Sequence, residues 1–370
     1  MDPSGVLHLL HGCLMQLSTN LELLDSKKYG GKPNAYVTLV MKGDFYVPGA
    51  LVLANSLRQT GTQSDIVCMV TDDVSLKARE VLGGVFDKVV SIQYISEPYT
   101  QLNTAKEENM YHHWMKDALT LYRCLWLFEY NKVCLLDSDV LVLRNMDSVF
   151  DLPAPAGSFH SFWLKGSHNP YPHDLRHGDP VPIESIKEAL RMQNSFVCIG
   201  NCLLLPPGED IANAFLSYIN DFVSKNKALG FDRCNSGANE QTIAHFFACR
   251  MAMQWTHIGT QYQCIPWKYS PHDKEGAPFL FHYFNIKPWT MDIHEFPDLQ
   301  VWWASAKAIC DAHPKAIDFF PAGNRANLSP KIGSIRTKKC LWCKGHHEFI
   351  DFTSNRITCP KIATITTTPY

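Results

Sequence analysis

Between residues 34 and 92, strand-like runs alternate with short helical segments, and this alternation constrains the fold more than any other feature of the chain. The runs Ala35–Val40, Asp65–Val70 and Phe86–Ile92 are apolar and contain many β-branched residues, which is typical of strands. Helices are predicted between them at Ala50–Arg58 and Ser75–Leu82. Alternating strands and helices form βαβ units, in which the strands run parallel. The sequence therefore predicts an α/β domain with a Rossmann-like beginning.

Regular elements are predicted up to residue 312. Met115–Tyr130 has the pattern of a long helix, and the apolar run Lys132–Leu136 is typical of a buried strand. Further elements are predicted as helices at Ile183–Arg191, Ile211–Val223, Glu240–Ala248 and Leu299–Cys310, and as strands at Phe196–Leu205 and Ala277–Phe281. We therefore divide the chain into an N-terminal lead (1–33), one α/β domain (34–312) and a C-terminal tail (313–370).

The composition fits a protein with a sizeable core and no general affinity for polyanions. Hydrophobic residues make up 46% of the chain, and a net charge of −2 argues against a nucleic-acid partner. No run of 18 apolar residues occurs, and the N-terminal segment lacks the basic residues that begin a signal peptide. The 13 cysteines are an odd number and mostly lie singly in apolar runs, which is typical of reduced thiols. We therefore expect a cytoplasmic or nuclear protein without a transmembrane segment.

The sharpest local feature is Asp137-Ser138-Asp139, which interrupts an apolar strand pattern. In extended backbone, alternate side chains point the same way, so Asp137 and Asp139 can face one point. Two buried like charges are costly unless a cation compensates them, and carboxylates are the ligands that Mg²⁺ and Mn²⁺ prefer. The alternative is an ordinary polar turn after a strand.

A second candidate segment runs from Phe279 to Trp289 and contains His282 and Lys287. A histidine at a strand end can complete a metal site, and a lysine shortly after it can meet a phosphate as a point charge. A lone histidine is more often a structural residue. The combination with the two acids is what indicates a site for a cation and a phosphate.

With these segments, the chain resembles the family 8 glycosyltransferases, the group of glycogenin and galactinol synthase, over residues 34–305. The motifs that carry the resemblance are Ala35-Tyr36-Val37-Thr38-Leu39, Tyr46-Val47-Pro48-Gly49, Asp137-Ser138-Asp139, Gly200, Glu240-Gln241, His282, Lys287-Pro288-Trp289 and Trp302-Trp303. The resemblance implies the GT-A glycosyltransferase fold, a Rossmann-like mixed sheet flanked by helices. It also implies transfer of a hexose, with retention, from a UDP-sugar to a sugar or protein acceptor in the presence of Mn²⁺.

The resemblance also implies roles for individual residues. Asp137, Asp139 and His282 would bind the metal ion, and Lys287 would hold the diphosphate. Glu240 and Gln241 match the acidic-Gln pair beside the transferred sugar, with the Gln241 amide oxygen a candidate for stabilising the oxocarbenium-like centre. The remaining donor contacts implied are Leu39 and Tyr46 at the uracil and ribose, Ser138 at the ribose, and Asn285 in place of the family's glycine after the metal-binding histidine.

The sequence departs from the family at two further positions. Leu121 stands where the family often has a lysine, and Lys116 is a candidate substitute about one helical turn earlier. Cys198-Ile199-Gly200 stands where the family has Asn-Ser/Ala-Gly beside the sugar, so the resemblance does not imply which sugar is transferred. Two other functions stay open: a non-catalytic relative that binds UDP or another nucleotide, and a metal-dependent phosphohydrolase or nucleotidyltransferase.

Residues 152–184 contain six prolines, at positions 153, 155, 170, 172, 180 and 182, which is too many for regular structure. We expect a long loop with two open interpretations. The loop either offers Trp163, Tyr171 and its histidines to an acceptor sugar, or is a surface segment stiffened by proline.

The tail contains one further metal-binding pattern. Cys340 and Cys343 form a C-x₂-C pair, His346 or His347 follows closely, and Cys359 lies farther on. This spacing is compatible with a tetrahedral Cys₃His zinc site, which would help a short tail to fold. The alternative is a set of reduced cysteines packed in the tail.

Overall fold

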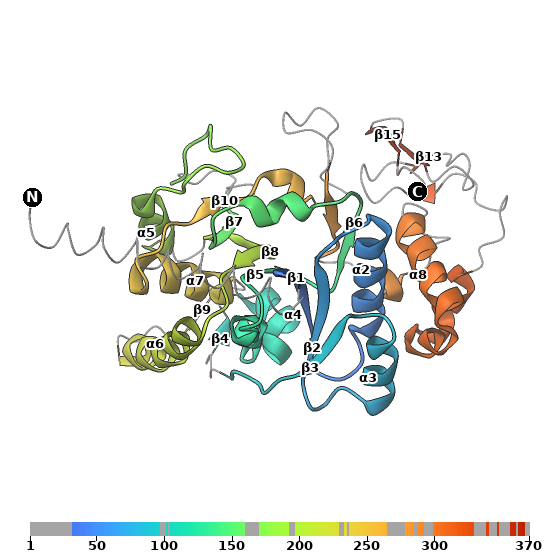
Figure 1. Ribbon diagram of the computed structural model, residues 1–370, viewed down its shortest axis with the longest axis horizontal. Coiled ribbons are helices and arrows are strands. Elements are labelled where there is room, and N and C mark those ends of the chain that lie inside the picture. Colours follow the sequence, from blue (N-terminus) through green and yellow to red (C-terminus); the bar gives the residue numbers. More distant parts are fainter. Residues whose placement is uncertain are drawn as a thin grey trace, which may run out of the picture.

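A seven-stranded sheet forms the centre of the computed structural model, with strand order β10-β7-β8-β5-β1-β2-β3 (Figure 1). The structure describes residues 32–96, 101–102, 104–159, 170–191, 197–228, 233–234, 237–264, 278–284, 287–291 and 299–328, and short strands at 338–339, 346–347, 356–359 and 362–366. The strands of the sheet, in spatial order, are β10 (Thr256–His257), β7 (Ala156–Ser158), β8 (Ile199–Leu205), β5 (Lys132–Leu136), β1 (Asn34–Val40), β2 (Asp65–Val70) and β3 (Lys88–Ser91).

The sheet is mixed. Strands β5, β1, β2 and β3 run parallel to one another, and β10 runs parallel to β7, whereas β8 runs antiparallel to both β5 and β7. A separate antiparallel pair joins β6 (Val140–Val142), which follows β5 closely, to β11 (Leu280–His282). The predicted α/β fold with a Rossmann-like mixed sheet is therefore confirmed.

Both faces of the sheet are buried, as the apolar strands require. Alternate residues of β1 enter different cores: Ala35, Val37 and Leu39 pack in one, and Tyr36 and Val40 pack in the other. Figure 1 shows α2 and α3 on one side of the strands and α6 and α7 on the other. The helices are α2 (Val47–Gln59), α3 (Leu76–Gly83), α4 (Ala105–Met115), α5 (Ile183–Arg191), α6 (Glu209–Ala228), α7 (Ala238–His245) and α8 (Gln300–Ala312).

The long helix predicted at Met115–Tyr130 is wrong. Helix α4 ends at Met115, and a 3₁₀ segment, η1 (Ala118–Trp126), follows it. The side chains of two polar residues explain the break, because Asp117 forms an ion pair with Lys42 and Thr120 accepts a hydrogen bond from Ile95 N at 3.0 Å. These tertiary contacts outweigh the local helical pattern.

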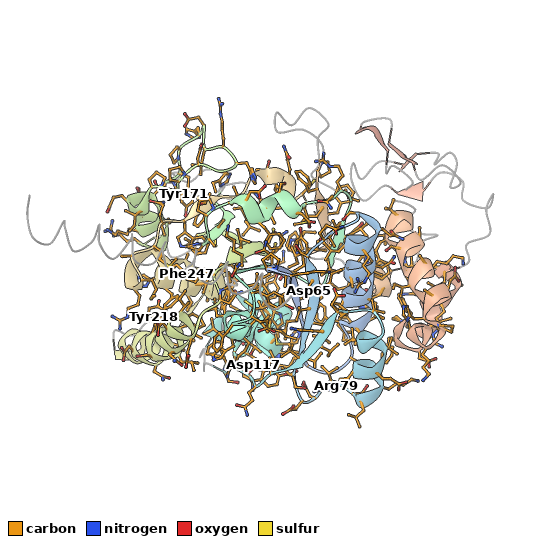
Figure 2. All side chains as sticks on the ribbon, in the orientation of Figure 1. Asp65, Arg79, Asp117, Tyr171, Tyr218 and Phe247 are labelled. Atoms are coloured by element: carbon orange, nitrogen blue, oxygen red, sulfur yellow. The ribbon has the colours of Figure 1, made fainter. Side chains whose placement is uncertain are left out.

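The predicted loop of residues 152–184 is partly wrong as well. Strand β7 lies inside this range and pairs with β8 and β10. Tyr171, labelled in Figure 2, is 4% exposed and donates a hydrogen bond to Val197 O at 2.6 Å. A tyrosine held in this way belongs to the core, so it is not available to stack on an acceptor sugar; Trp163 lies outside the described residues.

Two 3₁₀ segments, η8 (Pro314–Phe319) and η9 (Ala322–Leu328), continue from α8. Ala316 and Phe320 are buried in the hydrophobic cores that also include residues of α2. The domain boundary at residue 312 stays a prediction. Within the described part of the chain, no helix combines the length and the apolar character that a membrane span requires.

Candidate active site

The two acids of the predicted metal site lie where strand β5 ends. Asp137 follows β5 directly, and Asp139 precedes β6. The turn between them is closed by Val140 N, which donates to Asp137 O at 3.2 Å, and Asp137 N donates to Asn201 O at 3.3 Å. Strand β5 pairs in parallel with β1. The two acids therefore lie at the carboxyl edge of parallel strands, where α/β proteins bind ligands.

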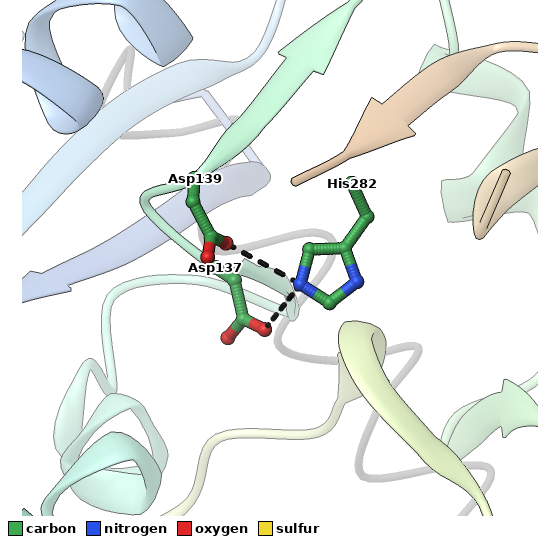
Figure 3. Close-up of side chains that lie close together, drawn as sticks. All are labelled: Asp137, Asp139 and His282. Atoms are coloured by element: carbon green, nitrogen blue, oxygen red, sulfur yellow. Dashed lines mark ion pairs between the residues drawn. The ribbon is translucent and has the colours of Figure 1, made fainter. Parts of the chain in front are cut away.

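His282 meets the acids because β11 pairs with β6, and in this register His282 lies opposite Val140. Its Nε2 atom lies 3.4 Å from Asp137 Oδ2 and 3.3 Å from Asp139 Oδ1 (Figure 3). One ligand atom from each of the three side chains lies within 4.8 Å of the others. Among the acids, cysteines and histidines of the described ranges, Asp137, Asp139 and His282 form the cluster that could hold a metal ion.

The chemistry of this group fits a divalent cation. Asp139 Oδ1 is buried, and the His282 ring nitrogen at 3.3 Å makes no well-aligned hydrogen bond to it, so an electropositive ligand between the two would satisfy it. Two carboxylates and one imidazole are donors that Mn²⁺ accepts. Burial and the negative charge of Asp139 raise the pKa of Asp137 to about 6, although His282 and Lys287 oppose the rise. A bound cation would remove this penalty.

Lys287 also reaches the two acids. Its ammonium forms an ion pair with Asp139 and donates to Phe284 O at 2.9 Å. Burial favours the uncharged lysine, but the charge of Asp139 outweighs burial and raises the pKa of Lys287. Burial alone would raise the pKa of Asp139, but the positive charge of Lys287 and the nearby His282 hold it well below its usual range. The predicted lysine is therefore charged and lies at the metal group.

The first turn of helix α2 packs directly on the acidic turn. A Cβ atom at Gly49 would lie 2.4 Å from Ser138 O and 2.7 Å from a ring carbon of Trp289, so only glycine fits. Tyr46 precedes this helix, and its ring centroid lies 5.7 Å from Lys287 Nζ. The sequence motif contained Gly49, but its role in this close approach was not predicted.

Glu240 and Gln241 lie side by side on α7. The carboxyl of Glu240 occupies the space in front of Gly200, where a Cβ atom would lie 2.5 Å from Glu240 Oε1. Burial raises the pKa of Glu240 to about 8, and the nearby charge of Asp137 adds to the rise. Glu240 therefore carries a proton at neutral pH and lies within electrostatic reach of the metal group.

The other predicted donor contacts are placed as follows. Ser138 is 8% exposed between the two acids, and Leu39, near the end of β1, is 6% exposed and packs in a hydrophobic core. Asn285 lies outside the described residues. Of the predicted zinc ligands, Cys340 and Cys343 lie outside the described residues, and the side chains of His346 and Cys359 are not described, so the zinc site stays a prediction.

A lysine that was not predicted lies at the end of β1. Lys42 forms an ion pair with Asp117 and lies 5.0 Å from the ring centroid of Tyr94, whereas the predicted substitute Lys116 is exposed. Lys42 has a φ of 61°, and Gly43 after it has a φ of 80°. The sequence signal for Lys42 is its place just after β1, a strand that ends at the same edge of the sheet as the two acids.

The chain is similar to known proteins both in sequence and in structure. No protein-family model matches it. Uncharacterized protein R707 of Acanthamoeba polyphaga mimivirus is 37% identical over 137 residues, which are 37% of this chain and 45% of that protein. UDP-glucuronate:xylan alpha-glucuronosyltransferase 2 of Arabidopsis thaliana is 29% identical over 148 residues, 40% of this chain and 23% of that protein. Glycogenin-2 of Homo sapiens is 38% identical over 118 residues, 32% of this chain and 22% of that protein.

The chain thus spans less than half of the length of these relatives.

Among solved structures, the galactosyltransferase LgtC with donor and acceptor sugar analogues aligns at a TM-score of 0.47 and 15% identity, over 79% of this chain and 99% of that chain. The glycosyltransferase GlyE of Streptococcus pneumoniae aligns at a TM-score of 0.43 and 14% identity, over 75% of this chain and 63% of that chain. By its sequence relatives, the chain is a homologue of the family 8 glycosyltransferases.

Proposed function

We propose that the protein is a retaining glycosyltransferase that moves a hexose from a UDP-sugar to an acceptor and requires Mn²⁺. The observation that carries this proposal is the meeting of Asp137, Asp139 and His282 within 4.8 Å of one another, from two segments far apart in the sequence. Two neighbouring acids, of which Asp139 is buried and Asp137 partly buried, are costly unless a cation and its anionic ligand complete the site. A nucleoside diphosphate bound through a divalent cation meets both needs.

The chain's own residues would hold the diphosphate from two sides. The ion, when bound at the Asp-Asp-His group, would act as a Lewis acid that offsets the negative charge of the leaving diphosphate. Lys287 supplies a second positive charge beside Asp139, which attracts the oxygens of a phosphate. Tyr46 offers an aromatic face next to Lys287, on which a ribose or a base can pack.

Helix α7 would border the transferred sugar. In a reaction with retention, the acceptor hydroxyl attacks from the face that the diphosphate leaves, so the protein needs no strong nucleophile. Gln241 remains the candidate that stabilises positive charge at the anomeric carbon through its amide oxygen. Its neighbour Glu240 lies within electrostatic reach of Asp137, which supports placing this helix at the sugar.

The donor sugar is not given by the relatives, because their names differ on this point. The Arabidopsis relative is named for UDP-glucuronate, whereas the human relative is a glycogenin. Neutral and acidic hexoses are therefore both candidates on the basis of similarity. The acceptor is a sugar or a protein.

Two other functions would use part of the same site. A metal-dependent phosphohydrolase needs the paired acids but not the segment from His282 to Trp289, so the ion pair between Lys287 and Asp139 favours the transferase. A non-catalytic relative would bind UDP without releasing sugar. It is the stronger alternative because Leu121 and Cys198 replace residues that the family uses.

The test is a screen of UDP-sugars with the purified full chain, with Mn²⁺ and with excess EDTA. The proposal predicts release of UDP and free sugar from at least one donor with Mn²⁺, and loss of that release with EDTA. Binding of UDP without release of sugar from any donor would favour the non-catalytic relative. Release of inorganic phosphate from the nucleotide would favour the phosphohydrolase.

A further inference from the structure

The segment that follows helix α8 folds back onto the candidate active site. It consists of η8 and η9 and lies beyond residue 312, where the sequence predicts the end of the domain. Phe320 and Leu328 of this segment pack in the same hydrophobic core as Trp289. Lys77 of α3 also pairs with Asp318 of the segment at 2.7 Å. The segment is therefore part of the folded domain and reaches the residues that follow β11.

Two asparagine side chains of η9 hold the backbone of one short turn. Asn324 Nδ2 donates to Trp289 O at 3.0 Å, and Asn327 Nδ2 donates to Met291 O at 3.1 Å. Asn327 is 3% exposed, and Asn324 is half-buried. The two accepting carbonyl groups lie in and directly after η6 (Pro288–Thr290), a single 3₁₀ turn. Carbonyl groups at the end of a helix lack partners within the helix, and the two amides provide donors for them.

This turn carries Lys287 at its start. Thr290 donates to Lys287 O twice, from its N atom at 2.9 Å and from its Oγ1 atom at 2.8 Å. The backbone of Lys287 is therefore fixed by the same turn that the two asparagines hold. The Lys287 ammonium forms an ion pair with Asp139 and donates to Phe284 O. Since a lysine is a point charge on a flexible stem, the position of this charge depends on how firmly its backbone is held.

A turn as short as η6 needs contacts from outside. A 3₁₀ turn has poor hydrogen-bond geometry, and three residues are too few for a helix to be stable alone. The ring of Trp289 is 1% exposed and anchors the middle of the turn in the core. A buried ring fixes one side chain, whereas hydrogen bonds to the carbonyl groups fix the peptide planes. The two asparagines therefore supply the restraint that the core does not.

We propose, on the basis of the proposed function, that Asn324 and Asn327 are positioning residues for binding of the donor diphosphate. By fixing the turn after Lys287, they hold its ammonium beside the Asp-Asp-His group, where the phosphate oxygens of a UDP-sugar would lie. Segment η9 is then part of the donor site, although it lies beyond the predicted domain and beyond the residues that carry the family resemblance. In this role the asparagines act through Lys287 and not on the nucleotide itself.

The test is a double-mutant cycle on the full chain, with UDP affinity in Mn²⁺ measured by calorimetry. Loss of one hydrogen bond to the turn should weaken UDP binding by about 3- to 10-fold in Asn324→Ala and in Asn327→Ala. In a Lys287→Met background, the same substitutions should change UDP affinity by less than about 2-fold, because the charge that they position is gone. The same loss in both backgrounds would show that the asparagines do not act through Lys287 and would overturn the inference.

Two controls separate positioning from general damage to the fold. Mn²⁺ affinity without nucleotide should stay within about 2-fold in both asparagine variants, because the Asp-Asp-His group lies at β5, β6 and β11. The matched variant is Asn55→Ala, since Asn55 Nδ2 donates to Ser305 Oγ at 2.9 Å and joins α2 to α8. It should leave UDP affinity unchanged. An equal loss of UDP affinity in Asn55→Ala would contradict a specific role of η9.

The outcomes also separate this inference from the proposed function. Unchanged UDP affinity in a folded asparagine variant would overturn the inference and leave the proposed function intact. If Asn327→Ala does not fold, the half-buried Asn324 decides the question by the same cycle. Absence of UDP binding by the unmodified protein would overturn the proposed function, and the inference with it.

Discussion

Gly49 lies so close to Ser138 that a methyl group at residue 49 would come within 2.4 Å of the Ser138 carbonyl oxygen. The same methyl group would come within 2.9 Å of two carbon atoms of the Trp289 ring. Helix α2 can therefore rest on the turn that carries Asp137 and Asp139 only because this residue has no side chain. The helix, the acidic turn and the segment after β11 are thus held together at one point.

We predict that Gly49→Ala weakens both the fold and metal binding. The added methyl group meets a backbone atom, so the turn must move, at a cost of roughly 1–3 kcal/mol in the free energy of unfolding. Urea denaturation and a Mn²⁺ titration measure the two effects. The control is Gly83→Ala in helix α3, where a Cβ atom meets nothing within 4 Å. If Gly49→Ala behaved like this control, the close packing would not matter to the site.

A second prediction concerns the ion pair between Lys42 and Asp117. The Asp117 side chain is 4% exposed, and the Lys42 side chain is 31% exposed. Lys42→Met leaves the buried carboxylate without its cation, which we expect to lower the free energy of unfolding by about 2 kcal/mol. Lys32→Met is the matched control, because Lys32 pairs with Asp65 at 3.2 Å but is 43% exposed, and its loss should cost less than about 1 kcal/mol. Equal costs for the two variants would contradict the structural role of Lys42.

The elements that the sequence predicted well are those whose pattern is local. Helix α5 has its predicted bounds, and α3 (Leu76–Gly83) lies within one residue of the predicted Ser75–Leu82 at each end, because the Ser75 side chain accepts a hydrogen bond from Ala78 N and Gly84 ends the helix. The metal group was also predictable, since alternation in extended backbone brings Asp137 and Asp139 to one side. Its partner His282 was predicted as a histidine at a strand end, and the family resemblance identified it as a metal ligand together with the two acids.

The elements that the sequence did not predict depend on contacts between distant residues. The break after Met115 arises from the pairing of Asp117 with Lys42, 75 positions apart in the chain. The place of Glu240 depends on the absent side chain of Gly200, and the antiparallel β8 gives no local signal that separates it from a parallel strand. Such features are decided by tertiary packing, which a local pattern does not contain.

Lys287 should contribute to nucleotide binding. A lysine beside a diphosphate makes charge-assisted hydrogen bonds, so Lys287→Met should weaken UDP affinity on the order of 10- to 100-fold. Mn²⁺ affinity should not fall, because Asp139 loses a competing cation. Calorimetry with UDP and with Mn²⁺ separates the two, with Lys88→Met at an exposed ion pair as the control. Loss of Mn²⁺ binding together with UDP binding would indicate collapse of the site instead.

Glu240 should make the stability of the protein depend on pH. Burial raises its pKa to about 8, so the folded protein retains a proton that the unfolded chain releases near the usual pKa of a glutamate. The contribution of Glu240 to the free energy of unfolding is therefore fully present at low pH. It falls as pH rises above the pKa of Glu240 in the unfolded chain, and it levels off above the pKa near 8 in the folded protein.

The expected result is a gain in relative stability for Glu240→Gln as pH rises. Between pH 5 and pH 8 the variant should gain on the unmodified protein by on the order of 1–3 kcal/mol, measured as the difference in unfolding free energy by denaturant titration. Glu209→Gln at an exposed position serves as the control. Parallel curves for Glu240→Gln and the unmodified protein would show that Glu240 is ionised in the folded state.

The most direct test of the central claim is UDP release from a UDP-sugar, with Mn²⁺, by the unmodified protein and by Asp139→Asn. The substitution removes one anionic ligand but keeps the shape of the side chain, so turnover should fall by at least about 100-fold in a protein that still unfolds in one cooperative thermal transition. Asp151→Asn, at an exposed position beyond β6, is the matched control and should keep its turnover. If Asp139→Asn kept the turnover of the unmodified protein, the Asp-Asp-His group would not bind the catalytic cation.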